Sequence, residues 1–500
     1  MAYQILIPFL AYELITIFGV GIYLAKKGNN NDVEGFTLAG RTFGLALMVP
    51  TLVLVMLGTG HTIGALESSY TYGWVQVWFV IGHVFILSLG CVTTTIWVRK
   101  LRATSISEIM GRIYGDEMKI CIGAVNSMFT WGIISIETQG MAILVNTLTG
   151  FDIKWGIIIG GILGLAYTLF SGMKQTAILN FINLFVLYIG LALATFYIAI
   201  KLPGQNFDTI RTYYENTDPT MLHFFGTKTT FLEYAIPSII APLFCHSSGQ
   251  LLLQPAMAAK NVKVVKKAVW FCGPINCLVG IFIVTIGLTA KARMEMGFMA
   301  QYPAKIYAWR YMLANLPPWV MSLLVAAVFA GVVSSFAGCA LAPATIFVED
   351  IYKPYFKPDI TQKQYNYVIR ITVVVVVAMA TAVAQYLPGV INGLNWLFAW
   401  NIPSFFLLAY GLYWKINKKW SLTALLITWL INCLWCFTPL HSWLGLPNLH
   451  PAYITLGVSL VLLTVGNIVC KGETAYFRTD EYLSSPEYKM SRAEELEDIA

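Results

Sequence analysis

Two apolar segments of the sequence are interrupted by residues that weaken a helix. Residues 58–64 hold three glycines within seven positions, and residues 237–249 combine two prolines with a glycine and small polar residues. Both residue types disfavour a continuous helix. A helix that opens at such a point frees carbonyl oxygens, which bind small cations, and N–H groups, which face anionic solute groups.

A third segment carries hydroxyl groups at close spacing. Residues 330–335 read Ala-Gly-Val-Val-Ser-Ser, which places Ser334 and Ser335 one turn after Gly331. Sodium is a hard cation that takes oxygen ligands, much as calcium does. Carbonyls near residue 57 and these two hydroxyls are therefore candidates to surround a sodium ion without burying a net negative charge. The alternative is that each serine bonds back to the preceding turn of its own helix.

The elements that position these residues are membrane helices. The chain is 57% hydrophobic and only 11% charged, whereas soluble domains contain about 25% charged residues. A span needs about 20 apolar residues, and about thirteen such segments are predicted. They are centred near Leu14, Val55, Ile86, Ile134, Ile162, Tyr188, Pro242, Ile281, Ala327, Val375, Phe405, Thr428 and Val461. The predicted fold class is an all-α integral membrane protein.

The basic residues predict how these spans are oriented. If the N-terminus is outside and the sides alternate, about three-quarters of the 32 Lys and Arg residues fall on the inner side, as expected for cytoplasmic segments. We therefore predict a multi-pass protein of the plasma (inner) membrane with a cytoplasmic C-terminus. The polar tail after Lys471 is expected to be a mobile cytoplasmic end.

The two interrupted helices, the second and the seventh, lie five helices apart. This spacing predicts a five-plus-five inverted repeat whose site lies between the two halves. Alternatively, the glycines only permit close helix packing. The expected segments are residues 1–44 (first helix and loop), 45–202 (first repeat), 203–228 (outer loop), 229–437 (second repeat and helix 12), 438–471 (helix 13) and 472–500 (tail).

Candidate solute-binding residues are mostly polar and aromatic side chains inside the predicted spans. Glu137 is an ionisable residue inside a span, which suggests a functional role. It is expected to pair with a cationic solute or, alternatively, with a polar group of another helix. Aromatic faces with one carboxylate suit a soft organic cation. The candidate solute-binding residues are Gly60, His61, Gln76, Trp131, Glu137, Gln139, His246, Trp396 and Phe398.

Several motifs resemble those of the sodium/solute symporter family, whose members have a LeuT-like inverted-repeat fold. The resemblance is carried by residues 39–41 (Ala-Gly-Arg), 57–61 (Leu-Gly-Thr-Gly-His), 72–74 (Tyr-Gly-Trp), 171–174 (Ser-Gly-Met-Lys), 254–260 (Gln-Pro-Ala-Met-Ala-Ala-Lys), 330–335 and 349–352 (Glu-Asp-Ile-Tyr). It implies alternating access and sodium coupling. By position, it implies a sodium site made by Leu54, Leu57, Gly331, Ser334 and Ser335.

The sequence departs from the family where a second sodium site is found in some members. Those members use an Asp in the sixth helix and further serines in the ninth, whereas this chain has Asn180, Ala337 and Gly338. The expectation is therefore one sodium ion per cycle. Asn180 is a candidate to steady the ninth helix by hydrogen bonds instead.

These observations predict sodium-coupled uptake of a small organic solute, with an organic cation or zwitterion as one candidate class. A proton-driven or sodium-independent carrier for an amino acid or small carboxylate is the alternative, because the Asp is missing and His61 follows the break. No zinc spacing, nucleophile elbow or phosphate loop suggests an enzyme. The expected cofactor is the sodium ion, and the expected partners are the solute and the lipid bilayer, with neither nucleic acid nor an obligate protein partner.

Overall fold

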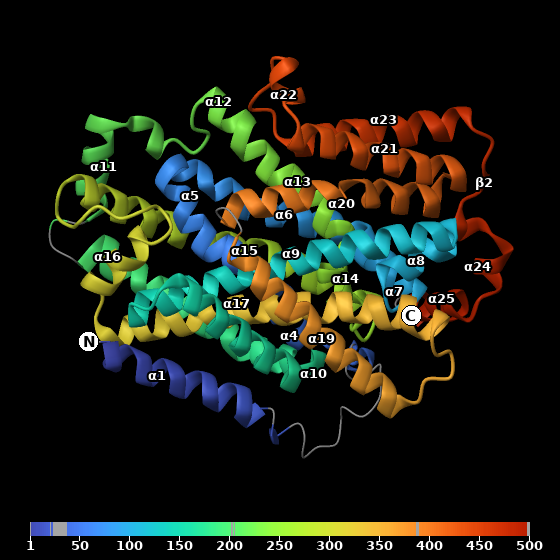
Figure 1. Ribbon diagram of the computed structural model, residues 1–500, viewed down its shortest axis with the longest axis horizontal. Helices are drawn as coiled ribbons and strands as arrows, with labels where there is room; N and C mark the ends of the chain where they lie inside the picture. The colour runs from blue at the N-terminus through green and yellow to red at the C-terminus, as the bar shows by residue number, and fades with distance from the viewer. Residues whose placement is uncertain are drawn as a thin grey trace.

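The structure is a computed structural model that describes residues 2–20, 22–23, 38–201, 204, 206–386 and 390–497. Within these residues the chain is almost entirely helical, and the strands β1 (Lys415–Ile416) and β2 (Glu473–Thr474) form one short antiparallel pair. Most of the long helices run roughly along the longest axis of the molecule, with α1 starting at one end and α25 lying at the other (Figure 1).

The elements follow one another in a simple order. The helices are α1 (Ala2–Leu14), α4 (Leu45–Met56), η3 (Gly60–Gly64), α5 (Ala65–Tyr72), α6 (Val77–Val92), α7 (Thr94–Leu101), α8 (Ile106–Tyr114), α9 (Asp116–Thr149), α10 (Ile153–Phe196), α11 (Phe207–Thr217), α12 (Lys228–Thr230), α13 (Ile236–Ser248), α14 (Gln250–Met257), α15 (Val262–Glu295), α16 (Tyr307–Asn315), α17 (Pro318–Ile346), η8 (Phe347–Tyr352), α19 (Gln362–Ala384), α20 (Val390–Tyr413), α21 (Lys418–Phe437), α22 (Leu440–Trp443), α23 (Pro451–Val469), α24 (Asp480–Ser484) and α25 (Pro486–Glu497).

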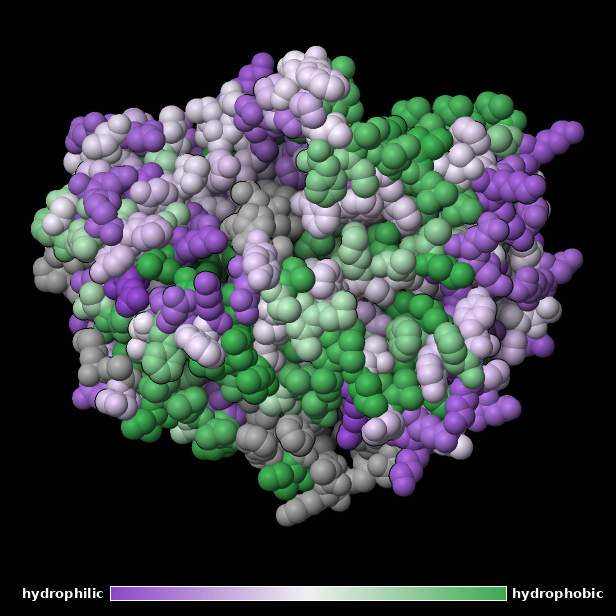
Figure 2. Space-filling model, viewed as in Figure 1, coloured by the Kyte–Doolittle hydropathy of each residue, from purple (hydrophilic) through white to green (hydrophobic). Residues whose placement is uncertain are grey.

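Among the described residues, eight helices are long and apolar enough to cross a membrane, and a ninth span is a helix pair bent by 45°. Two shorter apolar helices, Leu45–Met56 and Ile153–Leu169, add to these. Hydrophobic residues cover much of the middle of the molecule, and hydrophilic residues gather towards its ends (Figure 2). The prediction of an all-α multi-pass membrane protein is therefore confirmed.

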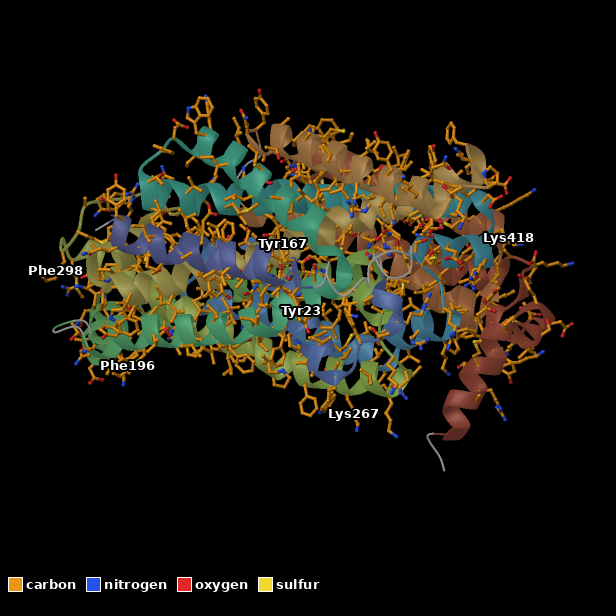
Figure 3. The ribbon with its side chains drawn as sticks, turned by 90° about the horizontal axis from the view of Figure 1, so that it is seen from below. Tyr23, Tyr167, Phe196, Lys267, Phe298 and Lys418 are labelled. Carbon is orange, nitrogen blue, oxygen red and sulfur yellow. The ribbon has the colours of Figure 1, made fainter. Side chains whose placement is uncertain are left out.

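Helix α17 is the most deeply buried of these spans. Its most apolar stretch is 94% buried, and it packs against α1, α4, α9, α10 and α19. It is apolar on every side, as expected for a helix surrounded by protein. Seen from below, the surrounding helices run from the end near Phe196 and Phe298 towards the end near Lys418 (Figure 3). The serine pair of the sequence motif thus lies at the centre of the helix bundle.

The prediction of a mobile tail is wrong for the part of the tail that the structure describes. It forms α24 and α25, and the rings of Tyr476 and Tyr482 are buried and contact each other at 5.7 Å between centroids. Glu487 lies 3.8 Å from Arg112 of α8. Burial of aromatic rings, which a count of charged residues does not reveal, holds this segment against the bundle.

Candidate functional site

The second span opens within three residues. Helix α4 ends at Met56, Leu57 has non-helical backbone angles (φ −94°, ψ 51°), and η3 begins at Gly60. The backbone N–H of Thr59 donates to Oε2 of Glu137 at 2.7 Å. The break is therefore real but shorter than the glycine pattern predicts, since residues 60–64 are wound as a π-helix.

The seventh span breaks at a single glycine. Gly249 is extended (φ −89°, ψ 140°) between α13 and α14, which are bent by 45° at this point. Pro242 lies inside α13, so the break is confined to the glycine end of the interrupted segment 237–249. The N–H of Gln250, the first residue after the break, donates to Oδ1 of Asn126 at 3.1 Å. A side chain of α9 thus satisfies one backbone group that the break leaves free.

Ser335 joins the ninth span to the broken second span. Its hydroxyl donates to the carbonyls of Leu54 at 3.2 Å and Val55 at 2.9 Å, 281 and 280 residues away in sequence. The hydroxyl of Ser334 is buried and has no hydrogen-bond partner. Neither hydroxyl bonds back to its own helix, so the back-bonding alternative is wrong for both serines.

Gly331 completes this contact between the spans. A side chain at Gly331 would place its Cβ 2.8 Å from the carbonyl oxygen of Leu57. This distance is too short for a carbon atom, so only glycine lets the two backbones approach. The five ion ligands expected from the family resemblance are thus brought together from α4, the break and α17, and all five residues are buried.

Imidazole rings gather beside the break in the second span. The ring of His61 lies 4.1 Å from that of His83 on α6 and 4.5 Å from that of Phe79. Nδ1 of His83 lies 3.1 Å from the amide nitrogen of Asn276, and Nε2 of both histidines is buried without a partner. Sequence reasoning missed His83, although a lone histidine inside an apolar span is a signal of its own.

A second group of rings surrounds His246. His246 on α13 contacts Phe398 of α20 at 5.0 Å and Phe129 of α9 at 6.0 Å between ring centroids. His246 also lies close enough to His61 and His83 for electrostatic interaction. Among the described residues no three His, Cys, Asp or Glu side chains are placed to hold a metal ion. The rings therefore provide apolar faces and polar nitrogens rather than a metal centre.

Two of the predicted solute-binding residues, Gln139 and Trp396, contact neighbouring helices. Gln139 donates to the carbonyl of Ala384 on α19 at 2.9 Å. Trp396 packs against Trp400 at 5.8 Å and Phe437 of α21 at 6.0 Å. Gln139 is therefore directed towards α19 and Trp396 towards α21.

Three candidate solute-binding residues remain, namely Gly60, Gln76 and Trp131. Gly60 contacts the side chain of Leu394. The side chain of Gln76 is buried and accepts a hydrogen bond from the hydroxyl of Tyr234. Trp131 is partly buried, and its ring N–H has no partner.

Asn180 does not steady the ninth helix as expected. It is fully buried, but neither atom of its amide makes a hydrogen bond. Its side chain therefore provides unsatisfied polar atoms within the bundle rather than a fixed link to α17.

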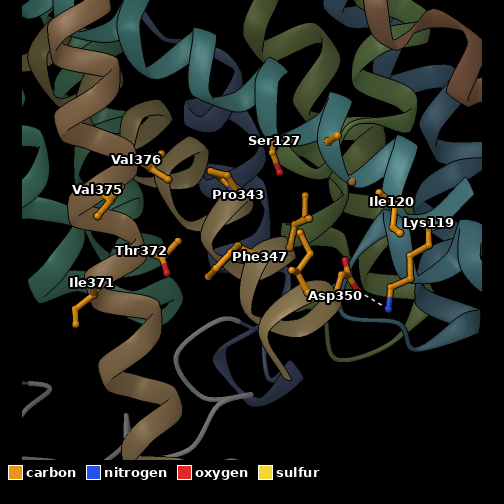
Figure 4. Close-up of a pocket in the computed structure, with 14 residues that line it drawn as sticks. Lys119, Ile120, Ser127, Pro343, Phe347, Asp350, Ile371, Thr372, Val375 and Val376 are labelled. Atoms are coloured by element: carbon orange, nitrogen blue, oxygen red, sulfur yellow. Dashed lines mark ion pairs between the residues drawn. The ribbon is translucent and has the colours of Figure 1, made fainter. Parts of the chain in front are cut away.

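A cavity of about 550 Å³ lies away from these groups, between α9, α17 and α19 (Figure 4). Lys119 and Asp350 form an ion pair of 3.2 Å at its edge. Ile120, Ile371 and Val375 line it, and each is about half exposed on the bundle surface. Its lining is mostly apolar and faces the lipid side, so we do not assign the solute to it.

Comparison with known proteins decides the family. Residues 36–428 match the model of the sodium:solute symporter family. The chain belongs to this family. The symporter is 24% identical over 449 residues to the sodium/glucose cotransporter of Vibrio parahaemolyticus, covering 81% of this chain and 80% of that one. It is 22% identical to the sodium/pantothenate symporter of Escherichia coli (strain K12), covering 93% and 97% of the two chains.

A solved structure confirms the fold. The symporter matches a substrate-bound outward-open state of a Na⁺-coupled sialic acid symporter with a TM-score of 0.80 and 16% identity, covering 94% of this chain and 99% of the other. The symporter is therefore a multi-pass membrane transporter with a LeuT-like fold and not an enzyme. Its family and its curated relatives support sodium as the coupling ion, and its solute is a small molecule.

Proposed function

We propose that this symporter uses one sodium ion per cycle to drive uptake of a small organic solute by alternating access. The ion is held by the carbonyls of the opened second span and by the ninth span, through Leu54, Leu57, Gly331, Ser334 and Ser335. The observation that carries this proposal is the hydrogen bonding of Ser335 to Leu54 and Val55. Hydroxyl and carbonyl oxygens already face each other there, and the Ser334 hydroxyl has no partner.

Ligands divided between two spans give the ion its effect on conformation. A ligand shifts an equilibrium only by its different affinity for the two states. If α4 and α17 separate when the inner side opens, sodium stabilises the state in which they are together. The membrane potential adds about 2.3 kcal/mol per charge per 100 mV to entry of the cation. Low internal sodium then favours release of ion and solute.

The proposed topology follows from the charge pattern and the two breaks. Thirteen spans form a five-plus-five inverted repeat in the plasma membrane, with the N-terminus outside and the C-terminus in the cytoplasm. Lys418, which begins a span on the proposed inner side, lies towards one end of the molecule, and Phe298 lies at the other (Figure 3). An odd number of spans agrees with α1 beginning at one end and α25 lying at the other.

The solute site is proposed beside the ion, between the two groups of rings. His61 and His83 form one group, and His246 and Phe398 form the other. A zwitterion suits this arrangement best among the candidate solutes. Aromatic faces attract its cationic group, and imidazole N–H groups donate to its carboxylate.

A proton-driven carrier for an amino acid or small carboxylate is the second candidate. The observation that favours it is the contact between His61 and His83, because two neighbouring imidazoles form a site that can bind a proton. Uptake into proteoliposomes, measured with and without a sodium gradient at fixed pH on both sides, separates the two. Uptake that ignores sodium and follows an imposed pH gradient would exclude sodium coupling.

A further inference from the structure

Glu137 occupies an unusual place for an intramembrane carboxylate. It lies within the long span α9, and only 4% of its surface is exposed. Its Oε2 accepts the backbone N–H of Thr59, which lies in the break of the second span. Among the described residues no Lys, Arg or His forms an ion pair with it. Burial without a charged partner disfavours the ionised form of this carboxyl, so a cation bound nearby would stabilise the carboxylate.

The carboxylate of Glu137 binds one of the two backbone groups that a missing helical hydrogen bond leaves without a partner. In an unbroken α-helix the N–H of Thr59 would donate to the carbonyl of Val55, four residues earlier. Here that N–H donates to Glu137, while the Val55 carbonyl accepts from Ser335 at 2.9 Å. Glu137 and Ser335 therefore hold the two sides of the same opening, and Ser335 is one of the proposed sodium ligands.

The glycine between them shows how close the two groups are. A Cβ built on Gly58 would lie 2.7 Å from Cδ of Glu137 and 2.7 Å from Oγ of Ser335. Both groups therefore border the same small volume next to the backbone of the break. Any side chain at position 58 would occupy the space that the carboxylate and the hydroxyl share.

We infer that Glu137 belongs to the cation site and supplies the negative charge that balances the sodium ion bound between α4 and α17. The inference rests on the proposed function, because it uses the same ion site. It assigns Glu137 to the ion rather than to a cationic solute. The other proposed ligands are neutral, so the bound ion would otherwise carry an uncompensated charge into the bundle.

The test measures sodium binding in the absence of any solute. Purified protein is titrated with sodium at constant ionic strength, with N-methylglucamine as the replacement cation, and binding is followed by ²²Na⁺ retention and by thermal shift. The variant is Glu137→Gln, which keeps the shape of the side chain and removes its charge. The matched control is Glu13→Gln, which makes the same change at a buried carboxylate of α1.

We expect Glu137→Gln to raise the sodium concentration for half-saturation by about tenfold or more, because a nearby charge is lost from a site of low polarity. Glu13→Gln should leave it within about twofold of the wild type, since no charge is removed from the break. Glu137→Asp keeps the charge on a shorter side chain, so its affinity should fall between those of wild type and Glu137→Gln. This variant also serves as the test if the glutamine variant does not fold.

The outcomes separate this inference from the proposed function. If Glu137→Gln and Glu137→Asp both bind sodium like the wild type while Ser335→Ala binds it weakly, the ion site stands and the role of Glu137 is wrong. If Ser334→Ala and Ser335→Ala also bind sodium normally, the proposed ion site itself is wrong. If Glu137→Gln loses solute binding but binds sodium like the wild type, Glu137 binds the solute and not the ion.

Discussion

The hydroxyl of Ser335 donates to the carbonyl of Val55 at 2.9 Å, at the point where the second span has lost its own hydrogen bond to that carbonyl. The N–H that would complete the helix, on Thr59, is bound to Glu137 instead. The opening of one span is therefore held by side chains from two others. Such an opening is tolerated at membrane depth only because protein surrounds it on all sides.

Ser335→Ala should weaken sodium activation of uptake. The variant removes one oxygen ligand of the sodium ion. A hydrogen bond to a charged group contributes about 1.5 kcal/mol or more, and we expect the loss of this ligand to cost a similar amount. The sodium concentration for half-maximal uptake should rise about tenfold, as measured in proteoliposomes at saturating solute. Ser322→Ala is the control, because Ser322 is a buried serine of the same helix that donates to Ile5 of α1. Equal sodium curves for Ser335→Ala and Ser322→Ala would contradict the assignment.

Gly58→Ala should abolish sodium-dependent uptake. Its methyl group would collide with the carboxylate of Glu137 and the hydroxyl of Ser335, so the break would have to rearrange. Gly457→Ala is the control, since a Cβ at this glycine of α23 meets nothing within 4 Å. In a helix that change is expected to be neutral or slightly stabilising. Normal uptake by Gly58→Ala would show that the close approach is not needed for the ion.

His83→Phe should impair solute binding while leaving sodium binding unchanged. The ring of His83 contacts His61 and Asn276, and neither of them is a proposed ion ligand. Loss of one hydrogen bond of about 1 kcal/mol raises the KM for solute about fivefold. The measurement is solute-dependent uptake at saturating sodium, alongside sodium-dependent thermal shift.

The control for His83→Phe is His450→Asn. His450 caps the start of α23, where its ring accepts the N–H of Ala452, and asparagine is also a good helix cap. A KM for His83→Phe equal to that of His450→Asn would place the solute away from the imidazoles. A parallel loss of sodium binding in His83→Phe would point to a change in the bundle rather than in the solute site.

Tyr482→Ala should release the C-terminal segment without stopping transport. The ring of Tyr482 is buried against Tyr476, Phe477 and Tyr488, and replacing a buried aromatic ring by Ala costs about 3 kcal/mol. Trypsin should then cleave at Lys489 and Arg492 faster than in the wild type, as followed by mass spectrometry. Leu483→Ala, at an exposed neighbour, is the control. Identical cleavage rates for the two variants would contradict the docking of this segment by Tyr482.

The sequence by itself determined the class of protein and the ion ligands to be tested. A chain with so little charge must use lipid as its solvent, and spans of about 20 apolar residues follow from the thickness of the bilayer. Glycine and proline mark where a helix can open, because their effect on the backbone is local. The breaks near Gly58 and at Gly249, and the serine pair of α17, were therefore accessible without a structure.

Only the tertiary structure decided what each polar side chain faces. Glu137 is 78 residues from Thr59 in sequence, and its direction depends on how α9 is rotated against the broken span. The same rotation turns Gln139, two residues later, towards α19. Apolar residues lie on every side of α9, so no polar face reports its rotation. The pairing of Glu137 with the break could therefore not be inferred from the sequence.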